Sequence, residues 1–277
     1  MSYGETEAVR GIDLEVQTGE IFAFLGPNGA GKTTTVEILE GYRSRTGGEV
    51  RVLGEDPEQA GRAWRDRIGI VLQSNSLDPY LTVRESLELY AGYFSRPRSV
   101  EETIALVGLE EKADERARRL SGGQQRRLDV GMALVGDPEL LFLDEPTTGF
   151  DPSARRQAWD VIAGLRELGK TIFLTTHYMD EAQRLADRVT IISGGLIVAA
   201  GTPEDLGERE KAAATIRYRD ARGEEVSIET VDPVRELHRL TTAALEAGEE
   251  LDGLEVTRPS LEDVYLDLTS TAEGAGE

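Results

Sequence analysis

The sequence contains no cysteine and only two histidines. Disulfide bonds and thiolate metal sites are therefore excluded, and a histidine-rich metal site is disfavoured. No stretch approaches the roughly 18–20 consecutive apolar residues that a membrane-crossing helix needs. The N-terminal segment MSYGETEAVRG has neither a basic start nor an apolar stretch, so it does not resemble a secretory signal. These absences lead us to expect a cytoplasmic location.

Basic residues are also scarce. The chain has 31 lysines and arginines against 52 aspartates and glutamates, which gives a formal net charge of −21 and a pI near 4.6. Nucleic-acid binding depends on clustered lysine and arginine that neutralise phosphates, so this balance argues against a nucleic-acid partner. The length of 277 residues is enough for one large domain with a small appendage, and hydrophobic residues make up 39% of them, which can supply a core.

Short apolar runs alternate with helical segments over residues 1–206. The runs have the continuous apolar character of parallel strands buried on both faces, and they lie at residues 20–25, 67–72, 140–143 and 171–175. Capping patterns predict helices that begin at Thr82 and Ser99. Another helix is predicted between Asp151, at its N-cap, and Gly169, just after its last turn. Strands that alternate with helices predict an α/β fold with a mostly parallel sheet.

The character of the sequence changes after Leu206. The remaining segment has predicted strands at residues 214–219, 226–230 and 254–257, and predicted helices at residues 233–247 and 260–268. This order predicts a small α+β appendage that ends in a tail of glycine, alanine and glutamate. We therefore expect two domains, 1–206 and 207–277.

A glycine-rich loop follows the first predicted strand. It fits the pattern G-x-x-x-x-G-K-[S/T] and comprises Gly26, Pro27, Asn28, Gly29, Ala30, Gly31, Lys32, Thr33 and Thr34. Its glycines allow backbone N–H groups to curl around phosphate oxygens, and the helix that starts near Lys32 adds a positive dipole. Lys32 is expected to reach the β- and γ-phosphates, and the Thr33 hydroxyl to ligate Mg²⁺. The loop therefore predicts a P-loop NTPase.

Two acidic residues end the apolar run at residues 140–143. Asp144 is placed at the carboxyl edge of the sheet, where a second contact to Mg²⁺ is expected. Glu145 follows directly and would polarise the attacking water as general base. Two acids after a strand are also common at the start of a helix, where the helix dipole favours them. Beside a phosphate loop, we favour the catalytic interpretation.

The segment from Leu120 to Arg126 reads LSGGQQR. Ser121 is placed at an N-cap before a predicted helix at residues 125–135, which makes a second anion-binding helix terminus in the chain. An ordinary capped helix would show the same pattern, but LSGGQ is the signature of the ABC ATPase superfamily. Together with the order and spacing of the other motifs, it makes residues 3–206 resemble that family. The resemblance implies a helical subdomain that carries the signature.

Four further residues are assigned by this resemblance. Gln73 looks like the family's Q-loop glutamine, which contacts the nucleotide and Mg²⁺. Asp151 looks like the D-loop aspartate, in addition to its place at an N-cap. His177 looks like the switch histidine. Tyr3 matches the aromatic residue that stacks on adenine.

The resemblance also implies a head-to-tail pair of ATPases, either two identical chains or two similar ones. Each ATP would lie between the phosphate loop of one copy and the LSGGQ helix of the other. The residues that would act on the partner's γ-phosphate are Ser121, Gly122, Gly123 and Gln124. The implied catalytic residues are Glu145, His177 and Lys32, and the implied Mg²⁺ ligands are Thr33, Gln73 and Asp144. ATP binding would close the pair and hydrolysis would reopen it.

The end of the chain narrows the resemblance further. GTPEDL at residues 201–206 and RPSLEDVY at residues 258–265 resemble the daunorubicin-resistance type of drug-exporter ATPases. That group pairs its ATPase with a separate ABC-2 type permease, so the implied location is the cytoplasmic face of the membrane. The stretch from Gln73 to about Phe94 would receive the coupling helices of the permease.

Three alternatives stay open at this point. Other ABC-2 exporters, such as those for polysaccharides or antibiotics, share these features. An ATPase of an importer is the second alternative. A soluble ABC ATPase of translation or DNA repair is the third alternative. The acidic charge disfavours it, and so does the sequence between Gln73 and Leu120, which is too short to hold the long coiled-coil insertion of such proteins.

Overall fold

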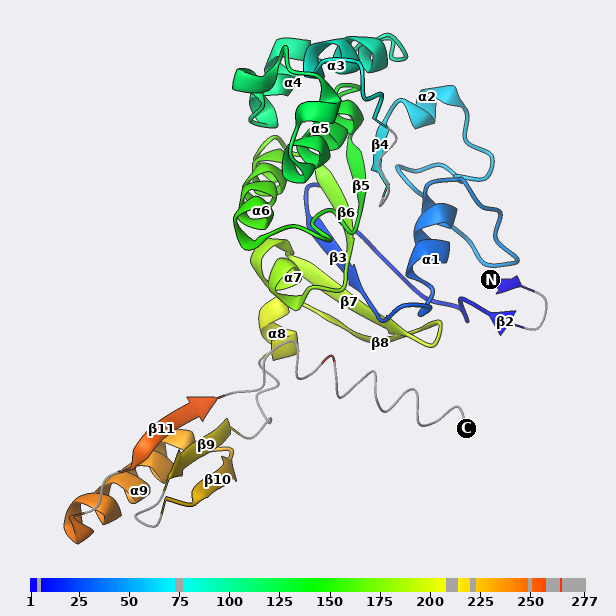
Figure 1. Ribbon diagram of the computed structural model, residues 1–277. Coiled ribbons are helices and arrows are strands. Elements are labelled where there is room, and N and C mark those ends of the chain that lie inside the picture. The colour runs from blue at the N-terminus through cyan, green and yellow to red at the C-terminus, as the bar shows by residue number, and fades with distance from the viewer. Residues whose placement is uncertain are drawn as a thin grey trace.

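The computed structural model describes residues 1–3, 6–72, 77–207, 214–219, 223–248, 251–257 and 265. A six-stranded sheet in the order β4-β5-β6-β3-β7-β8 forms its centre (Figure 1). These strands are β3 (Ile21–Leu25), β4 (Ile68–Val71), β5 (Leu140–Asp144), β6 (Thr171–Thr176), β7 (Arg188–Ser193) and β8 (Leu196–Gly201). Only β8 pairs antiparallel within this sheet, and the other neighbours are parallel. The predicted α/β fold with a mostly parallel sheet is confirmed.

The strands β3, β4, β5 and β6 are the four that the sequence predicted. Every residue of β3 and β6 is buried, because layers of helices and loops cover both faces of the sheet. Strands β7 and β8 were not predicted. The sequence does contain an indication of these two strands, because Gly194 and Gly195 form a two-glycine turn between apolar runs, which is typical of a hairpin.

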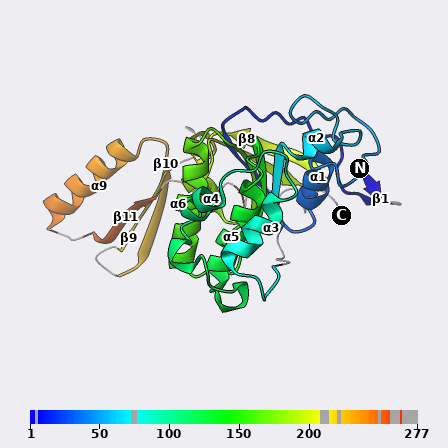
Figure 2. The same cartoon turned by 90° about the horizontal axis from the view of Figure 1, so that it is seen from above.

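Helices cover the two faces of the sheet. Figures 1 and 2 show α1 (Lys32–Leu39) on one side and α6 (Pro152–Glu167) on the other. One apolar cluster joins the strands to α1 and includes Phe22, Phe142 and Phe173. The other apolar cluster joins them to α6 and to α5 (Gly122–Leu134). Helix α7 (Met179–Leu185) lies beyond β6.

A helical subdomain made of α3 (Val83–Ala91), α4 (Val100–Leu106) and α5 packs beside the sheet. The predicted caps are confirmed: Thr82 forms a capping box with Glu85, and the Ser99 side chain accepts a hydrogen bond from the next turn. The predicted start of α5 at residue 125 is wrong. The helix begins at Gly122, because the Ser121 side chain caps the backbone from the first residue of the helix onward.

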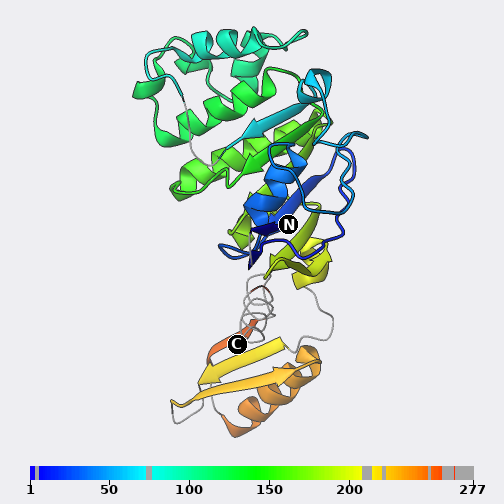
Figure 3. The ribbon, with the colours of Figure 1, turned by 90° about the vertical axis from the view of Figure 1, so that its right-hand side faces the viewer.

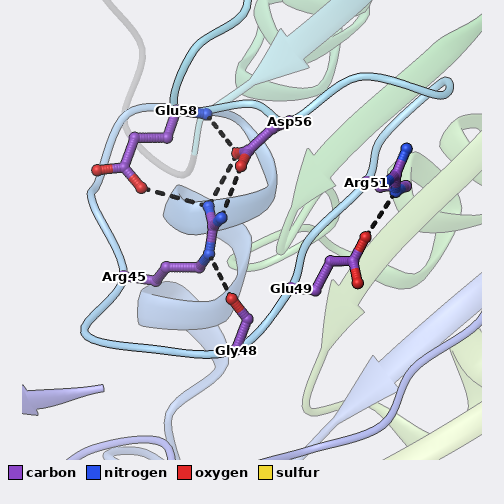
Figure 4. Close-up of polar contacts among 6 residues, drawn as sticks. All are labelled: Arg45, Gly48, Glu49, Arg51, Asp56 and Glu58. Atoms are coloured by element: carbon purple, nitrogen blue, oxygen red, sulfur yellow. Dashed lines mark hydrogen bonds and ion pairs between the residues drawn. The ribbon is translucent and has the colours of Figure 1, made fainter.

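The long connection from α1 to α2 (Arg62–Arg65) and β4 is held by one arginine (Figure 4). The Arg45 guanidinium donates two hydrogen bonds to the Asp56 carboxylate, at 2.8 and 2.6 Å, and one to Glu58 at 3.3 Å. Its Nε atom donates to the Gly48 carbonyl at 3.0 Å. The hydrogen bond from Arg45 keeps the pKa of Asp56 below its usual value. This loop therefore has a defined path without being part of the sheet.

A separate sheet forms the C-terminal part of the described chain. Its order is β10-β9-β11, with β9 (Ala214–Arg219) in the middle, β10 (Glu225–Thr230) and β11 (Asp252–Thr257) at the edges, and α9 (Pro233–Ala247) beside it. Figure 3 shows this unit apart from the six-stranded sheet, beyond α8 (Pro203–Gly207). The predicted helix at residues 260–268 lies outside the described residues, except for Tyr265, which is helical and packs on the core cluster that contains Leu206.

None of the helices in the described ranges is long and apolar enough to cross a membrane.

Candidate functional site

The phosphate loop connects β3 to α1, and two of its glycines are required by packing. A Cβ atom on Gly26 would lie 2.4 Å from the Ile192 carbonyl oxygen. Gly31 has a φ of 106°, and a Cβ atom there would lie 2.4 Å from the Ala8 carbonyl oxygen. Any side chain at either position would therefore displace a neighbouring backbone segment. These close approaches fix the loop with its backbone around the start of α1.

Lys32 is buried in this loop. Its Nζ atom donates hydrogen bonds to the carbonyls of Gly26, at 2.6 Å, and Pro27, at 3.1 Å. Burial lowers the pKa of Lys32, while the nearby carboxylates of Glu145 and Asp144 act in the opposite direction. The end of β5 therefore faces the phosphate loop, as the sequence predicted.

Asp144 and Thr33 offer suitable oxygens for a magnesium ion. Asp144 ends β5, and its Oδ1 atom accepts a hydrogen bond from the Thr175 hydroxyl. Thr33 is exposed in the first turn of α1. Within the described residues, no cluster of three or more histidine, aspartate and glutamate side chains forms a protein-only metal cage. One carboxylate and one hydroxyl fit Mg²⁺, which is usually held by few side chains together with phosphates and water.

Glu145 has an unusual backbone and a restrained side chain. Its φ is 45°, a region that non-glycine residues rarely adopt outside functional sites. Its N–H group donates to the carbonyl and the hydroxyl of Thr175, both at 3.1 Å. One side-chain oxygen lies 3.2 Å from Nδ1 of His177, and the other accepts from the Thr148 hydroxyl at 3.1 Å. The carboxylate is therefore held in one orientation at the end of β5.

His177 packs against Tyr178, which Arg155 contacts in turn. The Tyr178 ring lies 4.2 Å from the imidazole, centroid to centroid. The Arg155 guanidinium lies over the Tyr178 ring, 4.2 Å from its centroid, and donates to Asp180 at 3.2 Å. The cation–π contact and the ion pair link the first turns of α6 to the start of α7. This arrangement could not be predicted from the sequence, because Arg155 is distant along the chain from Tyr178 and Asp180.

Arg126 is a second residue that the sequence analysis missed. It is buried in α5 and donates hydrogen bonds to backbone carbonyls at the ends of two strands. Its acceptors are Pro146 at 3.1 Å, Asp144 at 2.7 Å, and Leu72. Its place directly after the LSGGQQ segment was the available signal. The cation connects the signature helix to the ends of β4 and β5.

The signature residues lie at the exposed start of α5. The Ser121 side chain accepts from the Gln124 N–H at 3.3 Å, and the Gln124 side chain accepts from the Ser121 N–H at 2.9 Å. In the described part of the chain, the polar contacts of these two side chains stay within the helix terminus and do not reach the phosphate loop. Gly122 is exposed, and Gly123 packs against α6. The four residues thus present their helix terminus outward.

Asp151 takes its predicted place at the N-cap of α6. One of its side-chain oxygens accepts from the N–H groups of Ser153, at 2.8 Å, and Ala154, at 3.0 Å. These hydrogen bonds lower its pKa. The aspartate is exposed, so a role towards a second copy stays a prediction.

Two predicted site residues lie outside what the structure describes. Gln73 falls in the gap between residues 72 and 77. The backbone of Tyr3 forms β1 (Ser2–Tyr3), which pairs with β2 (Thr6–Glu7), but the prediction that it stacks on adenine concerns its side chain, which is not among the described parts.

Comparison with known proteins decides the family. A family profile described as "ABC transporter" matches residues 9–148. The Nod factor export ATP-binding protein I of Burkholderia orbicola is 39% identical over 96% of this chain and 93% of its own length. The chain belongs to the ABC transporter ATP-binding subunits. As a member of that family it is an ATPase, as the sequence predicted.

Other proteins that are similar to this ABC subunit are also ATP-binding proteins or ATP-binding cassettes. The Nod factor export ATP-binding protein I of Cupriavidus pinatubonensis is 46% identical over 74% of this chain, which spans 64% of that relative's length. A dimeric ATP-binding cassette in a post-hydrolysis state with ADP and phosphate matches 73% of this chain and 94% of its own, with a TM-score of 0.64 and 26% identity. Another ATP-binding subunit of an ABC transporter matches 74% of this chain and 87% of its own, with a TM-score of 0.65 and 25% identity.

Proposed function

We propose that this ABC subunit hydrolyses ATP as a head-to-tail dimer and drives export of a drug or another amphipathic compound through a separate ABC-2 type permease. Two relatives are named for Nod factor export, which supports an exporter. A similar cassette is dimeric with ADP and phosphate, which supports the pairing. The GTPEDL and RPSLEDVY segments support the subtype. The proposed location is the cytoplasmic face of the membrane.

The observation that carries the proposal is the orientation of Glu145. Its carboxylate is fixed by His177 and Thr148, and it contributes to the electrostatic field at Lys32 in the phosphate loop. A carboxylate in this place can accept a proton from a water molecule that attacks the γ-phosphate of ATP. Lys32 can exchange its carbonyl acceptors for phosphate oxygens, because its ammonium group already lies in the loop. His177 keeps the Glu145 side chain in position through this step.

Thr33 and Asp144 are the described residues that would hold Mg²⁺, with Gln73 as the further predicted ligand. The ion would neutralise charge on the β- and γ-phosphates. The Thr175 hydroxyl orients the Asp144 carboxylate for this contact.

The signature residues would complete the site of a second copy. The start of α5 at Ser121 and Gly122 is exposed, so the positive end of its helix dipole faces outward. An ATP molecule bound to the partner's phosphate loop offers a γ-phosphate of matching charge. ATP would therefore join two copies, and its hydrolysis would remove the shared phosphate and release them.

Size-exclusion chromatography with Mg-ATP tests this proposal. Glu145→Gln keeps the shape of the side chain but removes the base, so hydrolysis should fall by about 10²–10⁴-fold and the ATP-bound dimer should accumulate. Ser121→Arg in the same background should remain monomeric, because the added side chain blocks the contact in trans. If Glu145→Gln hydrolyses ATP normally, or remains monomeric while saturated with ATP, the mechanism is wrong for this chain.

A further inference from the structure

A buried carboxyl group joins three segments that carry the proposed catalytic residues. Glu181 lies in α7 and is fully buried. Its Oε1 atom accepts a hydrogen bond from the Thr147 hydroxyl, at 2.7 Å, and another from the indole N–H of Trp159, at 3.0 Å. Thr147 lies in the loop after β5, and Trp159 lies near the middle of α6. Glu181 therefore connects that loop, α6 and α7 through one oxygen atom.

The loop after β5 contains Glu145, the proposed general base. Thr147 is fully buried and lies two residues after Glu145. The φ of 45° at Glu145 is strained, and such a conformation persists only where the surrounding structure holds it. The hydroxyl of the next residue, Thr148, donates to the Glu145 carboxylate. The hydrogen bond from Thr147 to Glu181 therefore anchors the backbone between the base and the hydroxyl that orients it.

The other two segments carry residues that act together with Glu145. Helix α7 follows His177, whose imidazole lies 3.2 Å from the Glu145 carboxylate. Helix α6 follows Asp151, which is predicted to face a second copy. The two helices contact each other beside the sheet (Figure 1). A shift of either helix would move the base relative to His177 unless a group such as Glu181 keeps the three segments together.

The surroundings of Glu181 favour a neutral carboxyl group. Its second oxygen, Oε2, is buried and has no hydrogen-bond partner in the described part of the chain. An ionised carboxylate with a bare oxygen is costly to bury, whereas a protonated one carries no charge. Burial accordingly raises the pKa of Glu181, although the neighbouring hydroxyl and indole groups act in the opposite direction.

The charged groups around Glu181 leave this balance in place. Asp180 on the same helix raises the pKa of Glu181 further. Arg155 of α6 pairs with Asp180, and Arg126 of α5 is near enough for a charge on Glu181 to affect its guanidinium. The two acids of α8, which packs against α7, are exposed to water, namely Glu204 and Asp205.

We propose that Glu181 is a positioning residue for ATP hydrolysis, which holds the loop of Glu145 against α6 and α7. It does so in its neutral form, in which one oxygen accepts both hydrogen bonds. The described hydrogen bonds of its side chain go to Thr147 and Trp159, so Glu181 acts through the loop and not on the nucleotide. The inference rests on the proposed function, because it takes Glu145 to be the general base.

Steady-state ATPase kinetics test this role. Glu181→Ala removes the shared acceptor, so kcat should fall by roughly 10–100-fold with little change in KM. Glu181→Gln keeps an acceptor at the place of Oε1 and should retain most of the activity. Wild-type kcat in Glu181→Ala, or an equal loss in Glu181→Gln, would overturn the inference. Thr147→Val removes only one hydroxyl group and should also lower kcat, so the test remains available if Glu181→Ala does not fold.

Glu20→Ala is the matched control. Glu20 is also buried, but it lies directly before β3, whereas the phosphate loop follows that strand. Its removal should lower Tm and leave kcat unchanged. A loss of kcat in Glu20→Ala as large as in Glu181→Ala would mean that any buried glutamate has this effect, and the specific role of Glu181 would be wrong.

The pH profile distinguishes positioning from a purely structural role. As the pH rises through the raised pKa of Glu181, the wild-type residue ionises and kcat should fall, whereas Glu181→Gln should keep its activity to higher pH. The chain has two tryptophans, so fluorine NMR of the fluorotryptophan-labelled protein reports on each. The Trp159 resonance should shift with pH in wild type and not in Glu181→Gln. Trp64 is the internal control, because its indole donates to the Val52 carbonyl, which does not titrate.

Equal pH profiles for wild type and Glu181→Gln, or a Trp159 resonance that does not respond to pH, would overturn the inference. Failure of the proposed function looks different. If Glu145→Gln hydrolyses ATP normally, Glu145 is not the base and the proposed mechanism fails whatever Glu181 does. If Glu145→Gln is inactive and Glu181→Ala is fully active, the inference about Glu181 fails alone.

Discussion

The Nδ1 atom of His177 lies 3.2 Å from the Oε1 atom of Glu145. The histidine directly follows β6 and the glutamate directly follows β5, so their pairing depends on the parallel register of the two strands. Behind the imidazole, Tyr178 and Arg155 form a stack that begins in α6. The direction of the Glu145 carboxylate, the proposed general base, is therefore set by a series of side-chain contacts that ends at Arg155, one turn after Asp151.

Removing the Tyr178 ring should loosen this arrangement without touching the nucleotide. We expect Tyr178→Ala to lower kcat by roughly 10–100-fold with little change in KM, because a small displacement of a catalytic group is costly. Tyr178→Phe keeps the ring contacts and should restore most of the activity. Steady-state ATPase kinetics on the three proteins distinguish these cases. Wild-type kcat in Tyr178→Ala would show that His177 needs no support.

Lys32→Ala should abolish ATP hydrolysis and weaken ATP binding, because the phosphates lose the buried cation of the loop. Lys170→Ala is a matched control, since this lysine is also buried but pairs with Asp137 at 2.8 Å, outside the site. It should reduce Tm and leave ATP binding intact. Turnover and nucleotide binding are measured on the purified proteins, and near-normal turnover in Lys32→Ala would refute the assignment.

Two glycines of the phosphate loop should respond differently to a methyl group. Gly29 and Gly31 both have positive φ, at 81° and 106°, but only Gly31 has a backbone oxygen in the way. Gly29→Ala should cost about 1–2 kcal/mol of unfolding free energy from backbone strain. Gly31→Ala should cost more and should also distort the loop. Urea unfolding gives both values, and equal losses would mean that the contact with Ala8 relaxes freely.

Glu181 should make stability depend on pH. It is fully buried, and burial raises its pKa even though the Thr147 hydroxyl, at 2.7 Å, and the Trp159 indole N–H, at 3.0 Å, donate to it. The folded chain therefore keeps this proton to a higher pH than the unfolded chain, in which a glutamate titrates near about 4.3. Its contribution to the free energy of unfolding is complete below that pH. The contribution is lost as the pH rises through the raised pKa of Glu181, and the free energy of unfolding then falls by up to about 1.4 kcal/mol per pH unit.

Glu181→Gln cannot titrate, so this part of the pH dependence should disappear from urea unfolding curves measured between pH 4 and pH 8. Both proteins should share the remaining dependence of the free energy of unfolding on pH, to which Glu40 contributes with the same sign. Parallel curves for wild type and Glu181→Gln would show that the Glu181 pKa is not raised.

A chain truncated after Leu206 should still bind ATP, because every predicted nucleotide motif precedes residue 202. We propose that residues 207–277 serve regulation or pairing with the permease. Tyr265 packs on the cluster that contains Leu206, so truncation exposes apolar surface and should lower solubility. Isothermal titration with ATP checks the binding, and a folded truncation that fails to bind would contradict this division of roles.

Much of the cassette could be predicted because its signals are local. The phosphate loop, the N-caps at Thr82, Ser121 and Asp151, and the apolar strands β3 to β6 each depend on residues within a few positions of one another. Helix α5 started earlier than predicted, since the two glycines weakened the helix signal while the Ser121 cap was strong enough to begin the helix.

The sequence by itself determined which side chains are proposed to carry the chemistry, because phosphate binding and capping depend on residue type at fixed spacing. The tertiary structure decided how those side chains are held. Arg126 reaches the ends of two strands, His177 meets Glu145, and Glu40 has no ion-pair partner among the described residues. None of these facts follows from spacing along the chain. Each depends on the order of strands in the sheet and on which groups folding removes from water, and both are properties of the packed chain as a whole.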